Sequence, residues 1–365
     1  MFNTNIISKE NEKFIIFGDF HFGAKFGNKL FQNYQIDSFN YIIDYARDNE
    51  IKNLIGAGDL HENKTLIYKD TLSIIQNCFI DSKDLNFILL CGNHDSLLRK
   101  SNKINTPSLL FQNEKNIRVI YEFPETFHFG DLYIDIFPWI NQENLESSMN
   151  YITQQKAKNH IAVGHFEISG FELVRGVIEN NGLKPSLFKK YSNVFSGHYH
   201  LRSQKGNINY IGSPLQITWN DFLDKKGFIV YDSNDNSFEF IEIPFSELHK
   251  KIIIDDTVSK INTIKGKKEI DFENSLEKIL KIYLNRKLSA TENSVIEELV
   301  TKACNFEIID NSIILNEIED VDPSITDNFE VLKEFILEQE DITDVSDDIL
   351  KILLEEYELI LKVKE

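Results

Sequence analysis

Short apolar runs alternate with segments of helical periodicity along the first two thirds of the chain. Three of these runs, each followed by a glycine, are Lys13–Phe17, Asn53–Ala57 and Asn86–Cys91. Between them, Gln35–Asn49 and Leu66–Phe79 carry apolar residues at the spacing of one helix face. This alternation predicts an α/β domain whose strands are buried on both faces and covered by helices.

Further strand-like runs continue to Pro244, so we place the end of this domain at residue 245. These runs are Asp131–Phe137, His160–Val163, Asn193–Phe195, Asn207–Ile211 and Gly227–Tyr231.

Two smaller parts are predicted beyond residue 245. Residues 246–320 contain a strand–helix–strand unit, with a strand at Ile279–Lys287, a helix at Thr291–Cys304 and a strand at Asn305–Asp310. Lys281, Arg286 and Lys287 form a basic group within it. Residues 321–365 start with a linker at Asp322-Pro323 and continue as two helices.

The two C-terminal helices begin with capping signals at Asp327 and Ser346. Leu350, Leu353, Tyr357 and Ile360 form one apolar stripe on the second helix. The stripe fits packing onto the chain's own core and docking of a partner equally well.

The formal net charge of −19 argues at first against a nucleic-acid ligand, because phosphate contacts come from Lys and Arg. The charge is unevenly spread, however: residues 1–245 carry a net −5, residues 246–320 a net −4 and residues 321–365 a net −10. The acidic excess is therefore concentrated in the C-terminal part, where a basic protein partner fits better than DNA.

Composition also narrows the compartment. No apolar run approaches the roughly 20 residues that span a bilayer, and the polar N-terminus predicts no secretory signal. Cys78, Cys91 and Cys304 are scattered and odd in number, which fits a reducing cytoplasm. Cys91 ends an apolar run and is predicted to be a small core residue.

Metal-binding side chains are concentrated in five short segments, each of which begins with glycine and follows a strand-like run. The segments are Gly18–His21, Gly58-Asp59, Gly92–Asp95, Gly164-His165 and Gly197–His200. Each is weak alone, since a single Asp after a strand is usually a turn or cap residue. Because ligands bind beyond the carboxyl ends of strands in α/β sheets, the five together predict one site.

The donor types indicate the kind of metal. Nitrogen and oxygen donors without thiolate suit Mn, Fe, Zn or Mg rather than a structural zinc site. Seven side chains are too many for one ion but suit two ions that share a bridging carboxylate. They are Asp19, His21, Asp59, Asn93, His165, His198 and His200. His94 is not needed as a ligand and is predicted to stabilise the charge that develops on a phosphorane or to protonate the leaving oxygen.

Over residues 13–245 this motif series resembles the calcineurin-like metallophosphoesterases. The resemblance implies a β-sandwich flanked by helices, with one metal on Asp19, His21, Asp59 and His200. Asp59 would bridge to a second metal held also by Asn93, His165 and His198, and His94 would be the catalytic histidine.

Within that superfamily the chain is similar to the SbcD-type DNA exonuclease subunits, and most closely to their T-even-phage relatives. The stretches that carry this similarity are Ile136–Ile140 with Asn141–Asn144, Gly164–Phe171 and Tyr210–Leu215.

This similarity implies a double-strand-end processing nuclease that acts with Mn as a 3′-to-5′ exonuclease and a single-strand endonuclease. It implies a capping domain at 246–320, a coiled-coil ATPase of the SbcC type bound through 321–365, and a homodimer. The family often has GDLFH where this chain reads Gly58-Asp59-Leu60-His61, so His61 is given no role.

Two other functions stay open. A phosphatase or small-molecule phosphodiesterase would use the same ligands, although it has no evident need for a docking stripe. A metal-free scaffold would be expected to have lost some ligands, and none is missing. His128, His160 and His249 have no motif context and are expected to be ordinary residues.

Overall fold

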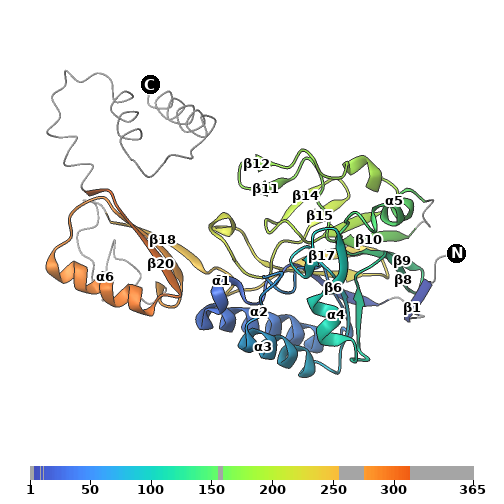
Figure 1. Cartoon of the computed structure of the whole chain (residues 1–365), viewed down its shortest axis with the longest axis horizontal. Helices are drawn as coiled ribbons and strands as arrows, with labels where there is room; N and C mark the ends of the chain where they lie inside the picture. The colour runs from blue at the N-terminus through green and yellow to red at the C-terminus, as the bar shows by residue number, and fades with distance from the viewer. Residues whose placement is uncertain (1–3, 9, 11, 155–158, 255–274, 313–365) are drawn as a thin grey trace, which may run out of the picture. The chain divides into compact units, whose positions relative to one another are not determined.

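The computed structural model describes residues 4–8, 10, 12–154, 159–254 and 275–312 (Figure 1). Most of them belong to one compact unit, Met1–Leu284 with Leu288–Ile309, and a second unit comprises Asn285–Lys287 and Asp310–Glu365. The predicted linker at Asp322-Pro323 and the helices starting at Asp327 and Ser346 lie outside the described residues. The division at residue 245 stays a prediction. None of the described helices combines the length and apolar character that a bilayer crossing demands.

The first sheet has six strands in the order β17-β16-β2-β3-β4-β7. Four of them run parallel, namely β2 (Lys13–Phe17), β3 (Asn53–Gly56), β4 (Asn86–Leu90) and β7 (Ile117–Ile120). The antiparallel strands β16 (Gly227–Asp232) and β17 (Ser237–Glu242) extend the sheet beyond β2. Helices α2 (Lys29–Asp48), α3 (Lys69–Ile80) and α4 (Thr106–Phe111) connect the parallel strands. The predicted strand–helix repeats are therefore confirmed.

The second sheet has seven strands in the order β1-β8-β9-β10-β13-β15-β14. Its strands are β1 (Thr4–Ser8), β8 (Glu125–Phe129), β9 (Leu132–Phe137), β10 (His160–Gly164), β13 (Asn193–Ser196), β15 (Ile208–Tyr210) and β14 (Ser203–Lys205). Strands β9, β10, β13 and β15 are parallel neighbours. Helix α5 (Leu145–Thr153) and the 3-10 helices η1 (Pro185–Phe188) and η2 (Trp219–Asp221) lie in the connections. Two short hairpins, β5 (Ser96–Leu98) with β6 (Ser101–Asn105) and β11 (Glu172–Val174) with β12 (Val177–Ile178), complete this part.

The two sheets pack face to face, as alternate residues of β2 show. Phe14 and Ile16 belong to the core cluster that joins the first sheet to the second. Ile15 and Phe17 belong to the cluster between the first sheet and helices α2 and α3. Burying the side chain of each Phe stabilises the folded protein by about 1.5–3 kcal/mol. The fold class is confirmed, but the expectation of helices on both faces is wrong for the first sheet. A wholly apolar strand does not reveal whether a helix or another sheet covers it.

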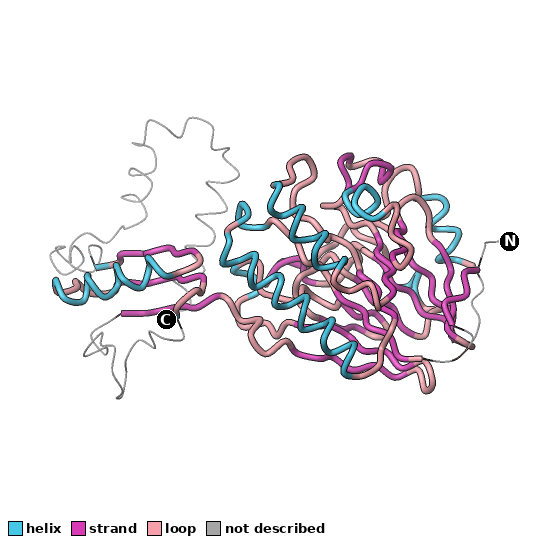
Figure 2. Tube along the Cα trace, turned by 90° about the horizontal axis from the view of Figure 1, so that it is seen from below, coloured by secondary structure: helices cyan, strands magenta, loops and turns pink. Residues whose placement is uncertain are grey.

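A third, three-stranded sheet follows in the order β18-β19-β20, made of β18 (His249–Ile254), β19 (Ile279–Leu284) and β20 (Asn305–Asp310). Helix α6 (Ala290–Lys302) lies along it (Figure 2) and buries Ile296 and Leu299 in a separate core cluster. The capping box of Ser289 and Glu292 starts this helix. The predicted strand–helix–strand unit is thus confirmed, with β18 as an additional strand.

An unusual turn, α1 (Ala24–Gly27), joins the end of β2 to α2. Lys25 and Phe26 have φ angles of 56° and 57°, and Gly23 and Gly27 on either side also have positive φ. The left-handed conformation costs a non-glycine residue about 1–2 kcal/mol. Two adjacent side-chain-bearing residues therefore hold a strained backbone at this turn.

Candidate metal centre

The eight residues predicted to form the site lie at the carboxyl ends of parallel strands from both large sheets. Strands β2, β3 and β4 of the first sheet lead to Asp19, His21, Asp59, Asn93 and His94. Strands β10 and β13 of the second sheet lead to His165, His198 and His200. The contacts described below join all eight into one cluster, at the sheet edge where α/β proteins bind their ligands.

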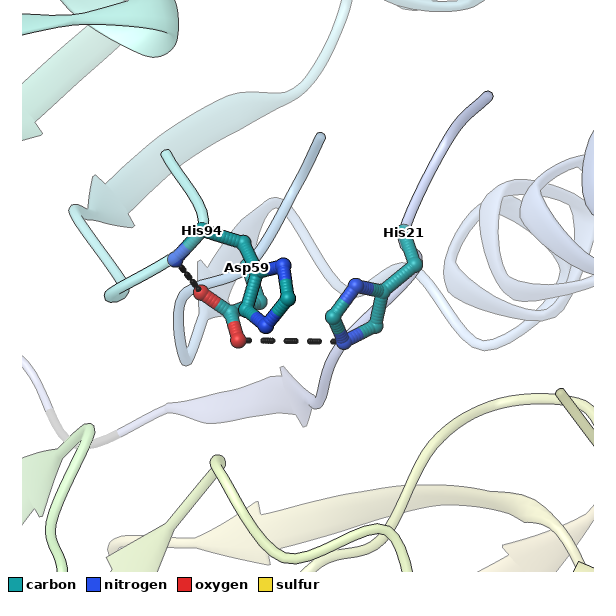
Figure 3. A group of neighbouring side chains, drawn as sticks. All are labelled: His21, Asp59 and His94. Carbon is teal, nitrogen blue, oxygen red and sulfur yellow. Dashed lines mark hydrogen bonds and ion pairs between the residues drawn. The ribbon is translucent and has the colours of Figure 1, made fainter. Parts of the chain in front are cut away.

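Asp59 occupies the centre of this cluster. Its Oδ1 accepts a hydrogen bond from the His94 backbone N at 2.7 Å, and its Oδ2 lies 3.7 Å from His21 Nε2 (Figure 3). The same Oδ2 lies 3.2 Å from His165 Nε2. Potential metal-ligand atoms of His21, Asp59 and His94 lie within 4.8 Å of one another, and so do those of Asp59, His165 and His198. Asp59 is common to both groups, as a bridging ligand would be.

Asn93 joins the two histidines of the second group. Its Oδ1 lies 2.9 Å from His165 Nε2 and 3.0 Å from His198 Nδ1. His165 Nδ1 lies 2.8 Å from the carbonyl oxygen of Ala57, which can only accept, so Nδ1 donates there. The Nε2 of a neutral His165 therefore presents a lone pair towards the oxygens of Asn93 and Asp59.

Asp19 and His200 also lie in contact with these residues. Asp19 Oδ2 accepts from the backbone N of His198 at 2.9 Å, whereas its buried Oδ1 has no hydrogen-bond partner. His200 Nε2 and His21 Nε2 face each other at 3.0 Å. An orphaned carboxylate oxygen and converging imidazole nitrogens are the arrangement that a cation would satisfy. The residues present therefore fit a metal centre.

The pKa values of these side chains are shifted because the groups are buried close to one another. Burial opposes a charge on His165, but Asp59 and Asp19 outweigh it and raise the pKa of His165 to about 9. Burial and His165 lower the pKa of His198 to about 3, and burial and His21 lower that of His200 to about 3. Burial raises the pKa of Asp19 to about 7, against the opposing effect of His165. A proton on His165 or a bound cation would offset the negative charge and the lone pairs that Asp19, Asp59 and the neighbouring ligands bring together.

Glycines make the close approach of these segments possible. A Cβ at Gly58 would lie 2.4 Å from His165 Nδ1, and one at Gly92 would lie 2.1 Å from Asp59 Oδ1. A Cβ at Gly197 would lie 2.6 Å from Asp19 Oδ1. The glycine that begins each of these three motifs therefore leaves room for the side chain of a different motif.

Three of the candidate ligands also have a strained backbone. The φ angles of His21, Asp59 and His198 are 49°, 48° and 85°, in the left-handed region that non-glycine residues rarely adopt. Such outliers gather at functional sites, where the surrounding structure holds them in place.

Glu62 is a site residue that sequence reasoning missed. Its Oε2 lies 2.6 Å from His21 Nδ1, and its backbone oxygen lies 2.6 Å from His94 Nδ1. The backbone contact makes Nδ1 the donor of His94 and leaves Nε2 available to the site. The only sequence signal for Glu62 is its position beside His61, in the segment that follows Asp59. His61 is buried, and its backbone N donates to Asp95 Oδ1.

A buried ion pair behind His200 was also missed. Lys226 Nζ lies 2.8 Å from Asp221 Oδ1 and donates to the backbone oxygen of His200 at 2.6 Å, and both charged side chains are fully buried. Asp221 Oδ2 accepts from the backbone N of Ile217 and of Thr218. No motif connects residues 200, 221 and 226, because only the tertiary structure brings them together.

Two residues inside stretches already singled out have contacts that the sequence did not suggest. Asp95, fully buried, accepts from the backbone N of Gly92 and so fixes the loop that carries Asn93 and His94. The ring of Trp139 lies 5.2 Å from that of His198 and 5.9 Å from that of His165, between centroids. Trp139 therefore forms one wall of the centre.

The histidines without motif context have partners outside the candidate metal centre. His160 lies 3.0 Å from the buried Asp135, and His249 packs against the ring of Trp219. The three cysteines are free and buried, and burial raises the pKa of Cys91 well above its ordinary value. Cys91 is a core residue, as predicted.

Residues 12–202, just over half of the chain, match the calcineurin-like phosphoesterase family. The chain therefore belongs to this family, and it is a hydrolase of phosphate-ester bonds. The prediction of a metallophosphoesterase is confirmed.

Among individual proteins, the chain is 29% identical over 335 residues to exonuclease subunit 1 of Enterobacteria phage T4, covering 91% of this chain and 94% of that protein. It is 25% identical over 281 residues to the SbcD subunit of nuclease SbcCD from Staphylococcus saprophyticus, covering 67% of this chain and 71% of that protein. Among solved structures, an archaeal phosphodiesterase matches with 13% identity and a TM-score of 0.33, covering 64% of this chain and 100% of that one.

Proposed function

We propose that this protein is the two-metal DNA nuclease subunit of a complex that processes double-strand ends. The observation that carries the proposal is the position of Asp59, which contacts candidate ligands from both large sheets. In the proposed centre one cation is held by Asp19, His21, Asp59 and His200. The second is held by Asp59, Asn93, His165 and His198, and the cation at both positions is Mn.

Two divalent cations would polarise the phosphoryl oxygens and supply a nucleophilic water for in-line attack. The chain's own residues have separate tasks. Asp59 positions both halves of the site, and the Glu62 carboxylate orients His21. His94, held by its Nδ1 on the Glu62 carbonyl, directs Nε2 at the reacting phosphate. In that position it stabilises developing charge or protonates the leaving oxygen.

DNA is proposed as the substrate because both relatives are named as nuclease subunits and one of them covers nearly the whole chain. The proposed activities are 3′-to-5′ exonuclease on duplex ends and endonuclease on single strands. Since both relatives are named as subunits, they also support a multi-protein complex. The proposed partner is a coiled-coil ATPase bound through residues 321–365, and the proposed assembly is a homodimer.

The test is cleavage of end-labelled linear DNA by the purified protein, with and without Mn. The wild type should release nucleotides only when Mn is present. His94→Ala should lower cleavage about 100- to 10,000-fold, the usual contribution of a general acid or base, while two metal ions stay bound. Metal content is measured by elemental analysis and cleavage on a denaturing gel.

His128→Ala is the matched control, since His128 lies on β8 and contacts Gly130 and Tyr133 rather than the centre. It should cleave DNA like the wild type. Hydrolysis of bis-para-nitrophenyl phosphate without cleavage of any DNA would reject the nuclease and favour a small-molecule phosphodiesterase. Absence of bound metal under every loading condition would reject the metal centre itself.

A further inference from the structure

Phe26 is the most exposed large hydrophobic side chain among the described residues. Its exposed fraction is 91%, whereas the next in order, Leu223 and Leu109, reach 71% and 63%. A single exposed apolar residue needs no explanation by itself. Phe26 differs because the left-handed turn that presents it is strained and the ring gains almost nothing from burial.

The turn is built directly on the candidate metal centre. The backbone N of Ala24 donates to the carbonyl oxygen of His21 at 2.9 Å, and Gly27 N donates to Gly23 O at 3.2 Å. A Cβ at Gly23 would lie 3.5 Å from the His61 ring. Phe26 therefore stands five residues beyond a candidate metal ligand, on a turn whose first hydrogen bond is accepted by the backbone of that ligand (α1 in Figure 1).

The far side of the turn is held as well. Asn28 Oδ1 accepts from the backbone N of Phe31 and caps α2, while Asn28 Nδ2 donates to the carbonyl oxygen of Cys304 at 3.0 Å. The strained conformation is thus fixed at both ends rather than free to relax. Backbone strain that serves no packing is a reason to look for a function.

The charges of the neighbouring sequence favour one class of ligand. Residues 22–36 contain Lys25 and Lys29 and no acidic residue, although the whole chain carries a net −19. An exposed aromatic ring with a lysine on either side of it in the sequence matches single-stranded nucleic acid, whose bases stack on aromatic faces and whose phosphates attract Lys.

We propose that Phe26, fixed on the left-handed turn Gly23–Gly27, is a stacking platform for an unpaired base of the DNA strand that enters the metal centre. The inference rests on the proposed nuclease function. Lys25 and Lys29 hold the phosphates on either side of the stacked base. A strained turn suits this task because it keeps the ring off the protein surface, where it would otherwise pack.

The experiment uses the full chain and a short single strand that contains 2-aminopurine, a base whose fluorescence falls when it stacks. Wild type should quench the probe. Phe26→Ala should abolish the quenching and weaken binding roughly 5- to 150-fold, while Phe26→Tyr restores both. Hydrolysis of bis-para-nitrophenyl phosphate should be unchanged in each variant, because that ester is too small to reach the platform.

Two further variants separate stacking from structure. Phe26→Gly should raise the thermal midpoint of unfolding, since glycine adopts positive φ freely, and yet bind DNA as weakly as Phe26→Ala. Ile80→Ala, a control 47% exposed at the end of α3, should bind DNA like the wild type.

Each contrary outcome has one meaning. If Phe26→Ala cleaves DNA and binds the single strand as well as the wild type does, the stacking platform is overturned and the proposed nuclease function stands. If Phe26→Ala binds DNA like the wild type but changes its oligomeric state in light scattering, the ring belongs to a protein interface. That result also overturns the stacking platform. Ester hydrolysis without any DNA binding by the wild type removes the proposed nuclease and the platform together.

Discussion

Adding one methyl group at Gly92 tests how closely the segments of the metal centre are packed. A Cβ at this position would lie 2.1 Å from Asp59 Oδ1 and 2.3 Å from the Asp59 backbone N, whereas ordinary contacts begin at 3.4 Å. Gly92 does not have a positive φ, so alanine causes no backbone strain of its own there. The whole effect of Gly92→Ala should therefore come from displacing Asp59.

The size of the effect follows from what Asp59 contacts. Overpacking a dense region costs about 1–3 kcal/mol in the free energy of unfolding. Asp59 also accepts from His94 N and lies beside His21 and His165, so its displacement disturbs both groups of ligands. Since a shift of about 1 Å at a reacting centre costs on the order of 100-fold in rate, DNA cleavage should fall at least that far.

The assay combines Mn titration by calorimetry, DNA cleavage and urea unfolding. Gly206→Ala is the matched control, because Gly206 has a φ of 60° and no atom within 4 Å of its added Cβ. This control should lose about 1 kcal/mol of stability through strain and keep wild-type Mn affinity and cleavage. If Gly92→Ala binds Mn and cleaves DNA like Gly206→Ala, the packing argument for the centre is wrong.

Three further results are expected. Lys226→Met should lower the free energy of unfolding in urea by about 3–5 kcal/mol, because it leaves Asp221 buried without its counter-charge. Adding Asp221→Asn to this variant should restore part of the loss. A Lys226→Met variant as stable as the wild type would contradict this. Burial opposes ionisation of Asp221, but Lys226 and His200 lower its pKa from 3.8 to about 2. Its contribution to stability should therefore be full above pH 3.8 and decline as the pH falls towards 2, and urea unfolding at several pH values should show no such decline in Asp221→Asn. Glu62→Gln should weaken Mn binding about 10- to 100-fold without changing unfolding, since Glu62 orients His21; unaltered affinity would show that the carboxylate is dispensable.

The sequence predicted those features that local patterns encode. Lys13–Phe17 is a strand with the predicted bounds because a short apolar run followed by glycine leaves few alternatives. Convergence of the motif residues followed from one rule about strand ends. Helix α2, in contrast, starts at Lys29 and not at Gln35, because the cap formed by Asn28 went unrecognised.

Other features depend on long-range packing and have no local signal. Strands β7 and β8 were missed because Ile117–Ile120 and Glu125–Phe129 are short and partly polar. The carboxylate of Glu62 reaches His21 because the backbone of residues 59–62 runs beside that of His21 and Phe22, with hydrogen bonds of about 3 Å. The identities of the side chains alone do not reveal that these two backbone segments run side by side.

The division of the candidate ligands between two sheets has a consequence for folding. Asp19, His21, Asp59 and Asn93 follow strands of one sheet, and His165, His198 and His200 follow strands of the other. Ions bound between them would act as a cross-link that closes the sandwich at one end. Ligation and sheet association are then a single equilibrium, so chelation should lower the melting temperature by an amount that depends on free metal concentration.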